Sequence, residues 1–105
     1  MKISESLINA GKPLDYYPSM AKALKSVKAT LFLCQLLYWQ GKQENEEWIC
    51  KSQVQVYTAT GLSRAGQDTA RRILRQAGII EEKLTGVPAT VHYKINLKNI
   101  INLLS

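Results

Sequence analysis

The sequence predicts a single α+β domain in which a three-helix core carries a small antiparallel sheet. Residues 27–40 are apolar on nearly every side of a helix, as expected of a central buried helix. Two more helical stretches follow, and a glycine at position 61 separates them. Residues 79–95 then have the pattern of two strands joined by a short loop.

The size and composition of the chain agree with this class. It has 105 residues, of which 46% are apolar and 21% charged. A chain of this length can bury one hydrophobic core, and this composition is not that of a disordered protein. We expect residues 1–15 to form an N-terminal arm and residues 16–105 to form the domain.

The first half of the domain is expected to contain two helices and a strand. Apolar residues at helical spacing predict a short helix over residues 19–24. Ser26 can cap the buried helix of residues 27–40, and Gly41 is expected to end it. Residues 47–51, EWICK, are rich in strand formers and predict a short strand.

The middle of the chain predicts two helices in close succession. Ser52 can cap a helix over residues 53–59. After the break at Gly61, Ser63 can cap a longer helix that runs to Ala77. The glycine that follows Ala77 closes this longer helix.

The remaining residues predict a hairpin and a last helix. Residues 79–84 and 90–95 alternate as half-buried strands do, and a small polar loop joins them. Asn96 can cap a helix over residues 97–104. Two helices joined by a tight turn, between a short strand and a hairpin, are the winged helix-turn-helix arrangement. The predicted fold therefore has a three-helix core, a small antiparallel sheet with a β-hairpin wing, and a C-terminal helix.

The positive charge of the chain is concentrated on one helix. The net charge is +6, from 14 Lys and Arg against 8 Asp and Glu, which indicates a polyanionic partner. All arginines lie on the long helix, at Arg64, Arg71, Arg72 and Arg75. On a helical wheel they lie opposite an apolar stripe, with Asp68 as the one acid among them.

An outward arginine face on this helix favours nucleic acid as the partner. A charged helix face is usually only solvated. A face of that ordinary kind, however, mixes acidic and basic residues more evenly than this one does. The planar guanidinium suits phosphates and guanine edges, and the second helix of a helix-turn-helix is the one that meets the major groove. The hairpin adds Lys83 and Lys94 beside its tip. A wing can follow the DNA backbone or enter the minor groove. An equal alternative is that this hairpin is an ordinary turn with two solvated lysines.

These residues carry a resemblance to known proteins. The string Ser52…Thr60-Gly61-Leu62-Ser63-Arg64…Ala70…Leu74…Ala77-Gly78-Ile79-Ile80 is similar to the helix-turn-helix and first wing strand of winged-helix DNA-binding domains. Three further groups resemble one subset, the N-terminal domains of phage- and plasmid-type (DnaD-like) replication initiation proteins; they are Leu37-Tyr38-Trp39, Trp48-Ile49 with Lys51-Ser52, and Tyr93-Lys94-Ile95-Asn96. The resemblance covers about residues 16–104. Many transcription regulators share the turn-to-wing pattern.

The resemblance implies a set of DNA-binding residues. It assigns the DNA-facing start of the recognition helix to Ser63, Arg64, Ala65, Gln67, Asp68 and Arg71. It implies that Arg72 and Arg75 meet the DNA backbone. Gln67 departs from the pattern, because an apolar residue that packs inward usually stands there. Either Gln67 reaches a base edge, or the helix docks in a rotated position.

The expected function is binding of double-stranded DNA through the helix of residues 63–77 and the hairpin of residues 79–95, in phage- or plasmid-type replication initiation. A transcriptional regulator of the same fold is one alternative. A winged-helix interaction module is another, since residues 97–104 present Leu97, Ile100, Ile101 and Leu104 at helical spacing as a candidate homodimer surface. Packing back onto the domain is the default for such a helix.

Several other classes are not expected. The chain has one histidine, His92, and no motif of a hydrolase, zinc protease or nucleotide-binding enzyme. Two cysteines and one histidine are too few for a zinc site, and we expect no metal, cofactor or small-molecule substrate. The longest near-apolar stretch, residues 31–39, is far shorter than the roughly 20 residues of a membrane span. No secretory signal is apparent, so a cytoplasmic protein is expected.

Overall fold

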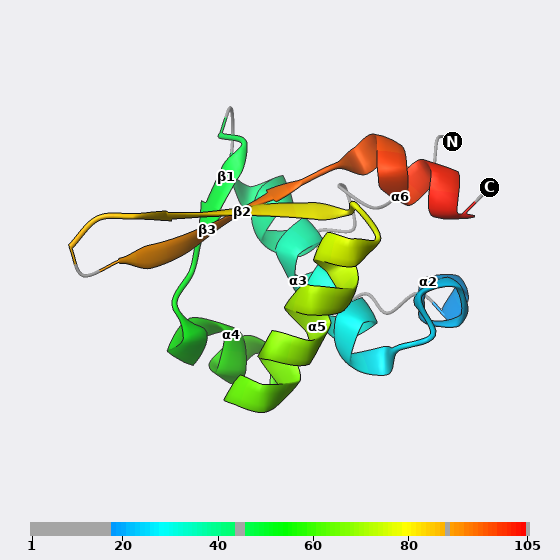
Figure 1. The fold of residues 1–105 in the computed structure, drawn as a ribbon, viewed down its shortest axis with the longest axis horizontal. Helices are drawn as coiled ribbons and strands as arrows, with labels where there is room; N and C mark the ends of the chain where they lie inside the picture. Colours follow the sequence, from blue (N-terminus) through cyan, green and yellow to red (C-terminus); the bar gives the residue numbers. More distant parts are fainter. Residues whose placement is uncertain (1–17, 44–45, 88, 105) are drawn as a thin grey trace.

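The protein is described from a computed structural model that covers residues 18–43, 46–87 and 89–104. It is a mixed α+β fold, as predicted (Figure 1). Its elements are α2 (Pro18–Leu24), α3 (Val27–Lys42), β1 (Trp48–Cys50), α4 (Gln53–Thr60), α5 (Arg64–Gln76), β2 (Ile80–Thr85), β3 (Thr90–Ile95) and α6 (Leu97–Leu104). The predicted arm, residues 1–15, and the first two residues of the predicted domain lie outside the described residues.

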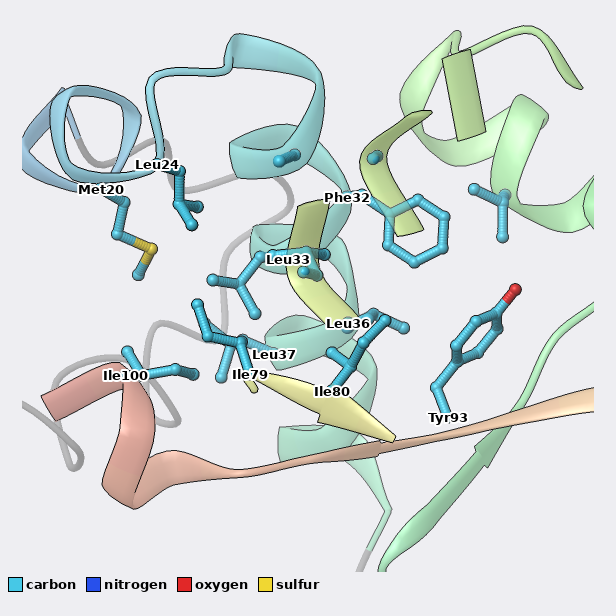
Figure 2. Close-up of a cluster of buried hydrophobic side chains, with 14 of the residues drawn as sticks. Met20, Leu24, Phe32, Leu33, Leu36, Leu37, Ile79, Ile80, Tyr93 and Ile100 are labelled. Carbon is cyan, nitrogen blue, oxygen red and sulfur yellow. The ribbon is translucent and has the colours of Figure 1, made fainter. Parts of the chain in front are cut away.

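Helix α3 is the centre of the core. Its side chains from Ala29 to Leu37 are buried on almost every side, apart from the half-buried Leu31. Figure 2 shows apolar side chains of this helix together with others from α2, the sheet and α6. The prediction of a central buried helix is confirmed.

The end of α3 differs from the prediction. Gly41 does not stop the helix, which continues to Lys42 and ends at Gln43. The backbone N–H of Gln43 donates to the carbonyls of Trp39 and Gln40, and its side-chain Nε2 donates to Trp48 O at 3.1 Å. These bonds supply the capping that a left-handed glycine would otherwise provide. They also connect the last turn of α3 to the start of β1.

The three strands form an antiparallel sheet in the order β1-β3-β2, in which β1 pairs with strand β3 of the hairpin. Ile49 of β1 and Glu82 of β2 both pair with Tyr93 of β3. These three residues share the face of the sheet that looks toward the helices. Tyr93 is buried there, with its ring edge-on to Phe32 at a centroid distance of 5.5 Å.

A short turn joins α4 to α5 and fixes the angle between them. Ser52 caps α4 reciprocally with Gln55, and Gly61 ends it in the left-handed conformation at φ 77°. Leu62 is buried in the core, and Ser63 then caps α5 by accepting a hydrogen bond from Gly66 N. The sequence predictions of both caps and of the glycine break are confirmed.

Helix α6 packs back against its own domain. Ile100 is fully buried, and Leu97 and Leu103 pack against the core. Asn99 Nδ2 donates to the carbonyl of Gly78 at 2.6 Å, which joins α6 to the turn after α5. Much of its apolar face is thus used within the chain, and a homodimer through α6 stays a prediction. No helix among the described residues is long and apolar enough to cross a bilayer.

Candidate nucleic-acid interface

Helix α5 has one buried and one exposed face. Its buried side chains are Gln67, Ala70 and Leu74, with Gly66 beside them. The residues exposed on the opposite side are Arg64, Ala65, Asp68, Arg72 and Arg75. The predicted amphipathic helix with an outward basic face is confirmed.

Two of the arginines carry unpaired charges. The side chains of Arg64 and Arg72 are exposed and form no ion pair with any residue that the structure describes. Ser63 and Ala65 are also exposed beside them, although the Ser63 hydroxyl is occupied as the cap of α5. This part of the predicted site is an exposed basic surface that extends from the start of α5 past its middle.

The other two arginines are paired with an acid that the sequence analysis did not identify. Arg71 binds Glu82 of β2 with two hydrogen bonds, Nε to Oε2 at 2.8 Å and Nη2 to Oε1 at 2.9 Å. Arg75 Nη1 donates to Oε1 of the same carboxylate at 2.9 Å. The exposed fractions of the side chains are 13% for Glu82, 24% for Arg71 and 46% for Arg75.

Electrostatics favours the charged forms in this cluster. Burial opposes ionisation of Glu82, but hydrogen bonds and positive charge from Arg71 and Arg75 outweigh it and hold the pKa of Glu82 below its ordinary value. The hydrogen bond to Glu82 raises the pKa of Arg71 above its ordinary value. The Arg71 guanidinium also lies over the Tyr93 ring, 5.8 Å from its centroid. Arg71 is therefore a structural link between α5 and the sheet.

Gln67 does not reach outward. Its side chain is 3% exposed, and its Nε2 donates to Gln53 O at 3.1 Å and to Leu62 O at 3.0 Å. The amide thereby satisfies carbonyls at the start of α4 and in the turn, which an apolar side chain could not do. The inclusion of Gln67 among DNA-facing residues is wrong, because it joins the two helices from the inside.

The two hairpin lysines lie on the outer face of the sheet, which looks away from α5. Lys83 Nζ lies 4.2 Å from the centroid of the Trp48 ring and Lys94 Nζ 5.9 Å from it. Lys94 pairs with Glu81 in the strand register and forms an ion pair with Glu47 at 3.5 Å. Because that register position is at the base of the hairpin, the prediction that Lys94 flanks the tip is wrong.

A groove that the sequence did not predict opens beside Arg64. It has a volume of about 380 Å³ and lies between the start of α4, the first half of α5 and the start of β3. Lys51, Arg64 and Arg71 give it positive charge, with Asp68 as its acid. The Lys51 ammonium also lies over the Trp39 ring, 5.1 Å from its centroid. The groove is wide enough for a phosphate group and its charge suits one.

Residues 18–43, 46–87 and 89–104 contain no group of three His, Cys, Asp or Glu side chains that could hold a metal ion. His92 lies on the hairpin, where its Nε2 is 2.6 Å from the Thr85 hydroxyl.

No protein-family model, curated protein or solved structure matches this chain.

Proposed function

We propose that this protein is a winged helix-turn-helix domain that binds double-stranded DNA. The observation that carries the proposal is the exposed basic face of α5, where Arg64 and Arg72 have no ion-pair partner among the described residues, beside a groove that Lys51 and Arg64 both line. Helix α5 is the recognition helix of this proposal, and the β2–β3 hairpin is its wing. Initiation of phage- or plasmid-type replication is the first biological role we propose, and transcriptional regulation is the second.

The major groove of a duplex admits an α-helix such as α5. The first turns of α5 would enter the groove and present Ala65 and Asp68 to base edges, while Arg64 would meet a phosphate. Arg72, which lies one turn beyond Asp68, would also meet a phosphate. The start of α4 opens on the same groove as Lys51, so the positive end of the helix dipole adds to the charge of that side chain.

Salt dependence of duplex binding tests the proposal. If Lys51, Arg64 and Arg72 each meet one phosphate, log K should fall with log salt with a slope of about −3 in an anisotropy titration of a random-sequence duplex. The variant Arg64→Gln/Arg72→Gln should reduce the slope to about −1. Lys98→Gln, an exposed residue on α6, is the matched control and should leave the slope unchanged. Absence of binding to any duplex at about 50 mM salt would overturn the proposal.

An interaction module is the second candidate function. Helix α4 exposes two large apolar side chains one turn apart, Val54 at 72% and Tyr57 at 57% exposure. Such side chains are common at protein interfaces. Sedimentation of the protein without DNA distinguishes the two functions: self-association that Val54→Ser/Tyr57→Ser abolishes would favour the interaction module, whereas a monomer that binds duplex favours the first proposal.

A further inference from the structure

We propose that Glu82 determines how strongly the protein discriminates between DNA sequences, by keeping Arg75 from DNA phosphates. This inference rests on the proposed function of duplex binding. In it, Glu82 occupies the guanidinium of Arg75, so that only Arg64, Arg72 and Lys51 meet the backbone. Glu82 is a positioning residue, since it acts through the arginine and touches no DNA itself.

The three hydrogen bonds at Glu82 are unequal. Arg71 forms two of them, and its guanidinium also lies over the buried Tyr93 ring, which fixes this side chain to the sheet. Arg75 forms only one, at 2.9 Å, and its side chain is 46% exposed. Arg75 is therefore the arginine that solvent and a DNA phosphate can reach.

The position of Arg75 explains why this contact matters. On the helix, Arg75 lies between Arg64 and Asp68 in angle, on the side of the exposed face that borders Arg71 and the sheet. A phosphate near that face could take the same guanidinium that Glu82 holds, because carboxylates and phosphates both pair with the planar fork. An arginine whose guanidinium a carboxylate already binds adds less to counterion release than a free arginine does.

The consequence concerns specificity. Phosphate contacts strengthen binding to every sequence alike, whereas base contacts distinguish sequences. A carboxylate that removes one phosphate contact lowers the non-specific part of the affinity and leaves the base contacts of the helix start in place. Glu82 therefore raises the ratio of specific to non-specific binding.

The test compares two neighbouring acids. Glu82→Gln frees Arg75, while Glu81→Gln removes the same charge from an exposed acid of β2 that pairs with no arginine in the described chain. With a random-sequence duplex, Glu82→Gln should steepen the salt slope by about one relative to the wild type and to Glu81→Gln. It should also lower the affinity ratio of a duplex selected from a random pool to the random duplex.

Arg75 provides the second arm, which does not depend on the stability of Glu82→Gln. Arg75→Gln alone should leave the wild-type slope unchanged, and adding it to Glu82→Gln should restore the wild-type slope. Equal slopes for Glu82→Gln and Glu81→Gln, or a flatter slope for Arg75→Gln alone, would overturn this inference while duplex binding stands. A wild-type protein that binds no duplex would overturn the proposed function and this inference together.

Discussion

The side-chain amide of Gln67 donates to the backbone carbonyl of Gln53, 14 residues earlier in the chain, at 3.1 Å. The same Nε2 donates to Leu62 O. One buried side chain of α5 therefore bonds both to the first residue of α4 and to the turn that follows α4. This contact sets how the basic helix sits on its neighbour. It also makes Gln67 a structural residue at a position where a base contact was expected.

Replacing Gln67 by Leu should lower stability and leave sequence preference unaltered. The apolar side chain would leave two carbonyls without their donor, at a cost of about 1–3 kcal/mol in the free energy of unfolding. Urea unfolding measures this loss, with Gln76→Leu at the exposed end of α5 as the matched control. A Gln67→Leu protein of wild-type stability with altered base preference would contradict the account.

Arg71 and Arg72 are neighbours in sequence and should respond very differently to substitution. Arg71→Met removes both hydrogen bonds to Glu82 and the contact with Tyr93, and should cost about 2 kcal/mol of unfolding free energy after allowance for solvent screening. Arg72→Met alters an exposed side chain and should change stability by less than about 0.5 kcal/mol. Thermal or urea unfolding checks both, and equal losses would refute the structural role of Arg71.

The stability provided by Glu82 should depend on pH. Its pKa in the folded protein is below the ordinary value of 4.5, so the unfolded chain takes up its proton first as the pH falls. The stabilisation is therefore complete above 4.5 and is lost as the pH falls through the folded pKa. The difference in unfolding free energy between the wild type and Glu82→Gln should be constant near neutral pH and shrink in acid. A difference that grew in acid would have the wrong sign.

Alanine at two glycines should act in opposite directions. Gly78 has φ +73°, and a Cβ there would lie 2.9 Å from Asn99 Nδ2, so Gly78→Ala should destabilise by more than about 1 kcal/mol. Gly66 is helical, and a Cβ there would meet Leu62 and Ser63 at 3.5 Å, an ordinary contact. Gly66→Ala should therefore stabilise by up to about 1 kcal/mol. The melting temperatures of the two variants test both predictions. A lower melting temperature for Gly66→Ala would contradict the expectation that a Cβ fits at this position.

Local signals in the sequence were sufficient for most of the fold. Ser52, Gly61 and Ser63 determine the bounds of α4 and α5 through capping within a few residues. The apolar and basic sides of α5 follow from helical period alone. By contrast, Gly41 stays helical because Gln43 supplies the cap, and that depends on contacts with residues up to Trp48.

The candidate site was predicted less completely because its details depend on contacts between elements. Glu82 lies 11 residues from Arg71, and only the docking of α5 on the sheet brings them together. One signal was present: Glu82 is an acid on the inward face of a strand next to an arginine-rich helix, where a buried carboxylate requires a partner. The error at Lys94 came from the hairpin register, which places that residue opposite Glu81 at the base.

The groove was not predicted because three separate elements line it. Lys51 precedes α4, Arg64 begins α5, and Thr90 begins β3. No periodicity in the sequence relates such positions to one another. Only the folded arrangement brings the charges of Lys51 and Arg64 to a common space.

The most direct test of the central claim is a map of backbone amide shifts on addition of a short duplex to the labelled protein. We predict that the shifts concentrate at the start of α4, along α5 from Ser63 to Arg72, and at the start of β3, and that they diminish with added salt. The amide signals of residues on the outer sheet face near Trp48, and those of α6, should not shift. A spectrum that does not change, or shifts centred on that outer face, would contradict the claim that the basic face of α5 binds DNA.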